Sequence, residues 1–221
     1  MYYGYGYGYG MNSSYLLVLI GVVICMLASF KMNSTFRKYS RMRNHSGITG
    51  REAAEQILRR AGIYDVRVEH VAGNLTDHYD PRSKVLRLSD ATYNSASVAA
   101  LGVAAHECGH AIQHDTGYVP LQIRGALVPV VNFGSMIAWP LILLGLFFTS
   151  RSSGMFLNLG ILAFSLAVLF QIVTLPVEFN ASGRAIRILG GSGLLYEDEV
   201  NATKKVLFAA ALTYVAGAIS S

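Results

Sequence analysis

Two histidines four residues apart, with a glutamate between them, are the residues most suited to catalysis. Residues 106–110, His-Glu-Cys-Gly-His, fit the pattern H-E-x-x-H, and the alanine- and valine-rich residues before them favour a helix. On a helix, positions i and i+4 share one face, so both imidazoles can reach a single metal ion. Glu107 would lie beside that ion and take a proton from a water molecule. The pattern predicts His106 and His110 as metal ligands and Glu107 as a general base.

The third ligand must come from elsewhere, because a catalytic zinc ion usually has three protein ligands and an open position for water. His114 shares the helix face, but it lies about 12 Å beyond His106 along a continuous helix. We therefore expect it beside the site and not on the metal. Glu178 is the better candidate, since it is the first charged residue after two apolar segments that return the chain to one side. The alternative is a carboxylate that only stabilises the start of an interfacial helix.

These two apolar segments, residues 125–150 and 154–177, are predicted to form a membrane hairpin. Neither contains a charged residue, and each exceeds the roughly 20 residues that a spanning helix needs. Pro129 and Pro140 are expected to kink the first helix, which bilayer helices tolerate. The hairpin would bring His110 and Glu178 to the same membrane face.

A further apolar segment, residues 14–30, is predicted to be the first transmembrane helix. Five basic residues follow it within residues 31–43, whereas a signal peptide would have them in front. Positive charges mark the cytoplasmic side of a membrane helix. We therefore expect a multi-pass cell-membrane protein with its N-terminus outside and its catalytic face in the cytoplasm. A cleaved signal peptide is the alternative.

The remaining ends of the chain are less regular. Residues 1–13 are a Tyr/Gly-rich tail, expected to be disordered or to act as an interfacial anchor. Residues 178–205 are predicted to be a helix that carries the third zinc ligand. The apolar residues 206–220 form a fourth membrane helix or, alternatively, a buried amphipathic helix, because 15 residues are short for a span.

Residues 31–124 are predicted to be the soluble catalytic part. Thr49 and Glu52 form a capping box at the start of a helix that ends at Gly62. Residues 64–71 are expected to be a strand, and residues 75–89 a hairpin whose exposed strand could bind an extended peptide. Residues 92–114 are expected to be the helix that carries the H-E-x-x-H pattern.

The composition agrees with a membrane protein: 52% of residues are hydrophobic and 14% are charged, against about 25% charged in soluble domains. The net charge of +5 does not indicate a nucleic-acid partner, because the basic residues cluster beside an apolar segment. The predicted fold class is a mainly α, multi-span integral membrane protein with a small α+β catalytic domain, in which a short hairpin or sheet accompanies the H-E-x-x-H helix. The oligomeric state is left open.

From residue 31 onward the sequence resembles the YugP-type membrane zinc metallopeptidases. More distantly it is similar to the HtpX and CAAX prenyl protease type of gluzincin, which shares two spans and a downstream glutamate. That wider group has an aspartate where this chain has Ser182, so the surroundings of the metal would differ. The segments that carry the first resemblance are STFRKYS (34–40), GITGREAA (47–54), LTDHYDPRSKVLRLS (75–89), AAHECGHAIQH (104–114) and LPVEFNASGRA (175–185).

The resemblance implies a zinc-dependent endopeptidase with one Zn²⁺ per chain, held by His106, His110 and Glu178. Its substrate would be a peptide or membrane protein. Cleavage is expected at the bilayer surface, because hydrolysis needs water and Glu178 directly follows its span. A zinc peptidase also needs a group that stabilises the oxyanion, for which the candidates are His78, Tyr79 and Arg184. The alternative class is a zinc-binding membrane scaffold or transporter without catalytic activity.

Overall fold

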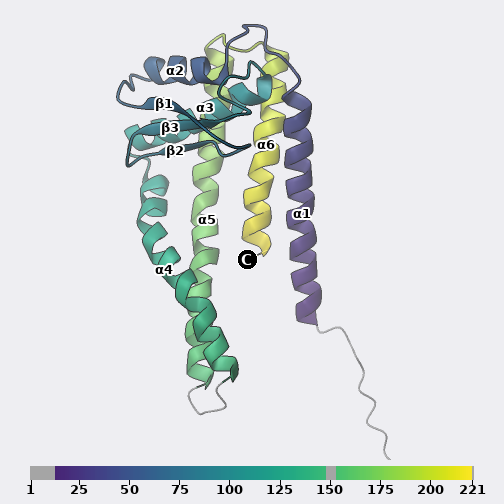
Figure 1. Ribbon diagram of the computed structural model, residues 1–221, viewed down its shortest axis with the longest axis vertical. Coiled ribbons are helices and arrows are strands. Elements are labelled where there is room, and N and C mark those ends of the chain that lie inside the picture. Colours follow the sequence, from purple (N-terminus) through teal and green to yellow (C-terminus); the bar gives the residue numbers. More distant parts are fainter. Residues whose placement is uncertain (1–12, 148–152, 221) are drawn as a thin grey trace, which may run out of the picture.

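Long helices run side by side away from a compact group of short elements in the computed structural model, which describes residues 13–147 and 153–220 (Figure 1). Four of the described helices are long and apolar enough to cross a membrane: α1 (Ser13–Tyr39), α4 (Val119–Phe147), α5 (Ser153–Gly191) and α6 (Glu197–Ser220). The sheet and the shorter helices gather at one end of them. This confirms the expected fold class, a helical multi-span protein with a small α+β part.

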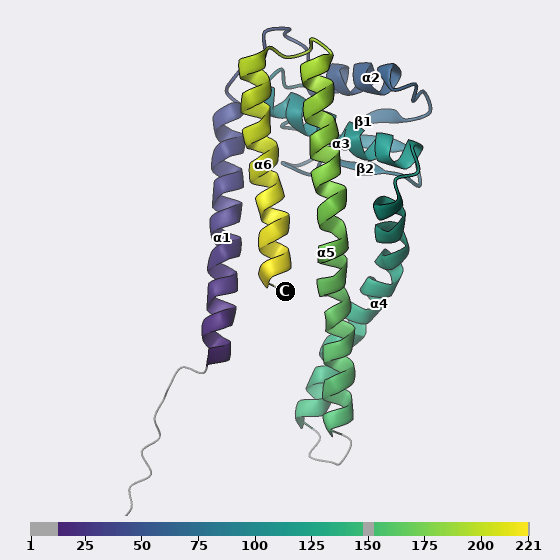
Figure 2. The ribbon, with the colours of Figure 1, turned by 180° about the vertical axis from the view of Figure 1, so that it is seen from behind.

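The long helices pack as two pairs, α1 with α6 and α4 with α5, and α5 also contacts α6 (Figure 2). Gly160 lets α4 and α5 approach closely, since a Cβ there would lie 2.6 Å from the Ile142 side chain. Of the expected tail at 1–13, only Ser13 is described, and it begins α1. The turn of the hairpin falls on residues 148–152, outside the described part of the chain.

The structure divides residues 154–205 differently from the sequence-based prediction. The expected span and the expected ligand helix are one continuous helix, α5, which continues through Pro176. The chain then turns at Gly193, which has a φ of 69°, a conformation that glycine adopts readily. Residues 197–205 belong to α6, whose first turn is held by a hydrogen bond from the Tyr196 N–H to Glu199. This gives the fourth helix 24 residues instead of 15.

The short elements are α2 (Gly50–Arg60), β1 (Arg67–Val71), β2 (His78–Asp80), β3 (Val85–Ser89) and α3 (Val98–Asp115). The sheet order is β1-β3-β2, with β1 parallel and β2 antiparallel to β3, so the hairpin leaves β2 at an edge. The predicted capping box of α2 is present. Helix α3 starts six residues later than expected from residue 92, because Ser97 caps it by accepting the Ala100 N–H.

Helix α3 is the centre of the fold, since it contacts α2, the sheet, α5 and α6. Several of its buried residues share one hydrophobic core with Ile57 of α2, Leu88 of β3 and Leu189 of α5. The helix that carries the H-E-x-x-H pattern is therefore fixed on several sides, with the ends of the membrane helices next to it.

Candidate metal centre

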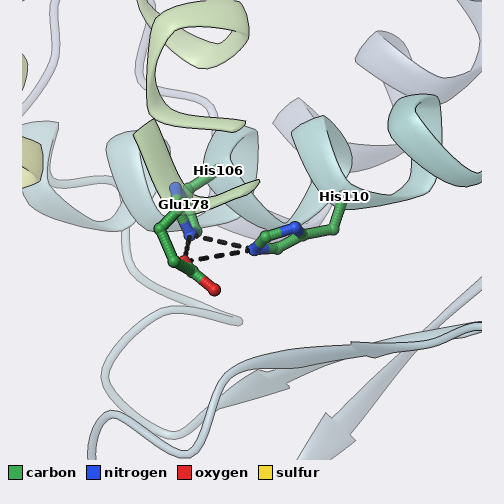
Figure 3. A group of neighbouring side chains, drawn as sticks. All are labelled: His106, His110 and Glu178. Atoms are coloured by element: carbon green, nitrogen blue, oxygen red, sulfur yellow. Dashed lines mark hydrogen bonds and ion pairs between the residues drawn. The ribbon is translucent and has the colours of Figure 1, made fainter. Parts of the chain in front are cut away.

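His106 and His110 of α3 and Glu178 of α5 point toward one another (Figure 3). The Nε2 atoms of the two histidines are 3.2 Å apart, and Glu178 Oε2 lies 3.2 Å from His106 Nε2 and 3.5 Å from His110 Nε2. In a tetrahedral zinc site with bonds near 2.05 Å, the ligand atoms are about 3.3 Å apart. The spacing of these three ligand atoms therefore matches that of a tetrahedral zinc site.

Gly109 explains how α3 and α5 come close enough for this arrangement. A Cβ at Gly109 would lie 2.7 Å from the carbonyl oxygen of Ala181 and 3.1 Å from its Cα. The backbones of the two helices thus meet between His110 on α3 and Glu178 and Ser182 on α5. The glycine within the H-E-x-x-H pattern is a packing residue that makes room for the helix carrying the third side chain.

The orientation of His110 is fixed by Gln113, a fully buried residue that the sequence analysis missed. The Gln113 amide group donates to the carbonyl of Val177 (2.9 Å) and to Asn180 Oδ1 (3.0 Å), so its own oxygen is left to accept. That oxygen lies 3.0 Å from His110 Nδ1. The proton of His110 therefore belongs on Nδ1, and the Nε2 lone pair is free to face a cation. Its position three residues after His110 on a helix was the available signal.

His106 is held in the same way by Ser182, whose Oγ lies 3.1 Å from His106 Nδ1. A hydroxyl can accept the Nδ1–H just as a carboxylate does, but it carries no charge. The structure thus places the serine at the second nitrogen of a candidate ligand.

The buried carboxylate of Glu178 has a second partner that the sequence analysis did not identify. Arg124 of α4 lies with its Nη1 3.3 Å from Glu178 Oε1, while Oε2 faces the histidines. Burial alone would lower the pKa of His110, but its hydrogen bond to Glu178 and the nearby charge of Glu107 raise that pKa above the usual value. Protons therefore compete with a cation for this site. Arg124 was detectable only as the last charge before an apolar segment.

Glu107 lies between two neighbouring cavities. The larger, of about 500 Å³, is bounded by β2, α3, the start of α4 and Tyr214 of α6; the smaller, of about 230 Å³, lies toward α1. Asp77 and Tyr214 also line both. Glu107 is 8% exposed, and none of the described side chains forms a hydrogen bond to its carboxylate. A water molecule near the histidines could therefore use it as a proton acceptor. Nothing in the sequence indicated Tyr214.

Three of the four other predicted site residues line the larger cavity, and the fourth does not. His78, Tyr79 and His114 line the larger cavity, and Tyr79 Oη is 2.9 Å from His114 Nδ1. Burial raises the pKa of Tyr79 to about 12, so its hydroxyl keeps its proton. His114 lies outside the group of three candidate ligands, in line with its expected position beside the site. Arg184 does not line the cavity, and its Nε donates to Asn180 Oδ1 at 2.8 Å.

Comparison with known proteins agrees with this geometry. Residues 14–221 match the family model described as "Putative neutral zinc metallopeptidase". The chain is 50% identical over 194 residues to a protein of Bacillus subtilis (strain 168) named "Putative membrane protease YugP", covering 88% of this chain and 85% of that protein. No solved structure matches. A zinc ion is the metal that this family implies, and four apolar helices agree with a membrane location. The chain belongs to the neutral zinc metallopeptidase family that this model describes.

Proposed function

We propose that this protein is a membrane-embedded zinc endopeptidase of the gluzincin type, with one Zn²⁺ bound by His106, His110 and Glu178. The observation that carries the proposal is the near-tetrahedral spacing of three candidate ligand atoms. Beside them lies the carboxylate of Glu107, which forms no hydrogen bond to any described side chain. A structural zinc site would be closed by a fourth protein ligand, whereas this one opens onto a cavity.

In this mechanism Glu107 moves the protons. A bound zinc ion would act as a Lewis acid, polarising the scissile carbonyl and lowering the pKa of a water molecule. Glu107 takes a proton from that water and delivers it to the leaving amine. Gln113 and Ser182 keep the imidazoles oriented during the reaction. Tyr79 and Tyr214 provide hydroxyl donors for the oxyanion on the cavity wall, whereas the Nδ1–H of His78 already donates to the carbonyl of Thr76.

The substrate is proposed to be an extended peptide that lies along the edge strand β2. This strand forms one wall of the larger cavity, opposite α3. Main-chain hydrogen bonds to a strand edge would fix the peptide bond near Glu107. Leu121 and Val128 of α4 supply apolar wall at the membrane end of the cavity. A peptide with an apolar side chain, such as the end of a membrane segment, fits this wall.

We further propose that the catalytic face is cytoplasmic. The five basic residues between 31 and 43 follow the apolar part of α1 on the side where the sheet lies. Labelling of single cysteines in intact cells tests this: Arg60→Cys should be shielded from a membrane-impermeant maleimide, and Ser152→Cys should react. The reverse pattern would place the catalytic face outside the cell.

Glu107→Gln tests the enzymatic role. The variant should retain about one zinc ion per chain but lose proteolysis of an unfolded membrane-protein substrate, because Glu107 acts as a base and not as a ligand. The matched control is Glu55→Gln, a half-buried glutamate of α2 whose ion pairs with Arg51 and Arg59 lie outside the candidate site. Zinc bound by all forms, with no cleavage by the wild type in a proteome-wide comparison of peptide termini, would favour the scaffold alternative. Normal cleavage by Glu107→Gln would contradict the assigned base.

A further inference from the structure

A second concave surface lies between α5 and α6, and it shares no lining residue with the larger cavity at the metal centre. It has a volume of about 470 Å³. Its walls are mostly apolar and include Phe179 and Ile186 of α5 and Phe208 and Ala211 of α6, whereas Lys204 and Lys205 provide its charged groups. Phe179 and Phe208 are 47% and 63% exposed, so large apolar side chains border it. We call this surface the α5–α6 groove.

The packing of α1 against α6 places the groove relative to the bilayer. Ser220 Oγ donates to the Gly21 carbonyl at 3.0 Å, and the two helices run in opposite directions. Lys31 of α1 and Ala210 of α6 each lie ten residues from this contact, so they are at a similar depth along the membrane normal. Lys31 is the first charge after the apolar part of α1, so the hydrocarbon ends near this level. Lys205 lies five residues beyond Ala210, about 8 Å, which is the depth of the headgroup layer.

The cations at the groove have no acidic partner. Lys204 and Lys205 are exposed, and within residues 13–147 and 153–220 neither forms an ion pair; Lys204 Nζ is 3.5 Å from Asn201 Oδ1. Arg187 adds a third positive charge near the rim, because its Nε donates to the carbonyl of Gly183, a groove residue. Glu199, the buried acid at the start of α6, is already bonded to His45 and the Tyr196 N–H.

We propose that the α5–α6 groove binds one anionic phospholipid. Its phosphate would lie against Lys204 and Lys205, and an acyl chain would extend along Phe179 and Phe208. Basic pockets between membrane helices recognise anionic headgroups. Lysines that merely reach up to the interface would attract anionic lipid without a defined site. The apolar groove next to Lys204 and Lys205 distinguishes a defined lipid site from such general attraction, because it also offers a surface for an acyl chain.

A bound lipid would also lie next to a residue that supports the metal centre. Ser182 lines the α5–α6 groove, and its hydroxyl is the group that holds His106 Nδ1. The proposal itself concerns binding and is independent of peptidase activity.

Native mass spectrometry of the full-length chain, purified in detergent, tests the proposal with dioleoyl phosphatidylglycerol and dioleoyl phosphatidylcholine as probes. The wild type should bind one phosphatidylglycerol about 10-fold more tightly than phosphatidylcholine. Lys204→Gln/Lys205→Gln should lose this preference. The matched control, Arg37→Gln/Lys38→Gln, removes two exposed charges from α1 and should keep it.

A second variant separates the groove from the charges alone. Gly183→Leu keeps both lysines but fills the groove, where a Cβ meets no atom within 4 Å, so it should weaken phosphatidylglycerol binding as well. Equal losses in the two double variants, full binding by Gly183→Leu, or displacement of the lipid by millimolar inorganic phosphate would each overturn the proposal.

Discussion

Replacing Gly109 by alanine should weaken zinc binding, although alanine is the better helix former. In an exposed helix this change stabilises by about 1 kcal/mol. Here the added methyl would lie 2.7 Å from the carbonyl oxygen of Ala181, whereas carbon–oxygen contacts are normally about 3.3 Å or longer. Helices α3 and α5 would have to separate by about 0.6 Å at this point.

That displacement is large relative to what a metal site tolerates. Ala181 lies three residues after Glu178 and directly before Ser182, so both side chains move with it. Ligand distances must stay within about 0.2 Å of their ideal values. Loss of the orienting contacts typically weakens metal binding about 10- to 100-fold, and we expect a loss of that size. Overpacking costs roughly 1–3 kcal/mol, partly offset by helix propensity, so the fold should survive.

The measurement is a zinc titration against a chromophoric chelator, with thermal unfolding recorded on the same samples. Gly183→Ala is the matched control, because this α5 glycine directly follows Ser182 but a Cβ there meets no atom within 4 Å. It should bind zinc like the wild type. If Gly109→Ala also binds zinc with wild-type affinity, the close approach of α3 and α5 does not position Glu178, and this account of the site is refuted.

Two further predictions concern the ligands and their support. Glu178→Ala should lose both zinc and activity, while His114→Ala should retain zinc, as measured by metal analysis of the purified proteins; the opposite result would exchange their roles. Gln113→Leu should leave the fold intact but reduce zinc affinity about 10- to 100-fold, because His110 loses the acceptor for its Nδ1–H. Unchanged affinity in the chelator titration would show that His110 needs no such partner.

The sequence allowed the candidate metal site to be anticipated because its chemistry follows from two local rules. Helical periodicity puts His106 and His110 on one face, and the apolar hairpin returns Glu178 to the same end. Both rules hold in the structure, where these three side chains converge. The fold class could be recognised for the same reason: lengths and charges of apolar segments determine what crosses a membrane.

The sequence could not show contacts that depend on how separate elements meet. Arg124 reaches Glu178 from α4, and Tyr214 reaches the cavity from α6, at separations along the chain that no spacing rule covers. Helix boundaries were also hard to place. The end of the apolar segment at residue 177 suggested a boundary that α5 does not have, whereas the turn at Gly193 lay inside an expected helix.

The continuity of α5 links the metal to the membrane mechanically. One rigid rod carries the apolar arm of the hairpin at one end, Glu178 in its middle and core residue Leu189 beyond it. Pro176, which lacks an N–H to bond the preceding turn, lies two residues before Glu178 without ending the helix. A bilayer too thick or too thin for the hairpin would tilt the rod and strain the ligand. By thermodynamic reciprocity, binding zinc would then favour the membrane thickness that leaves α5 unstrained.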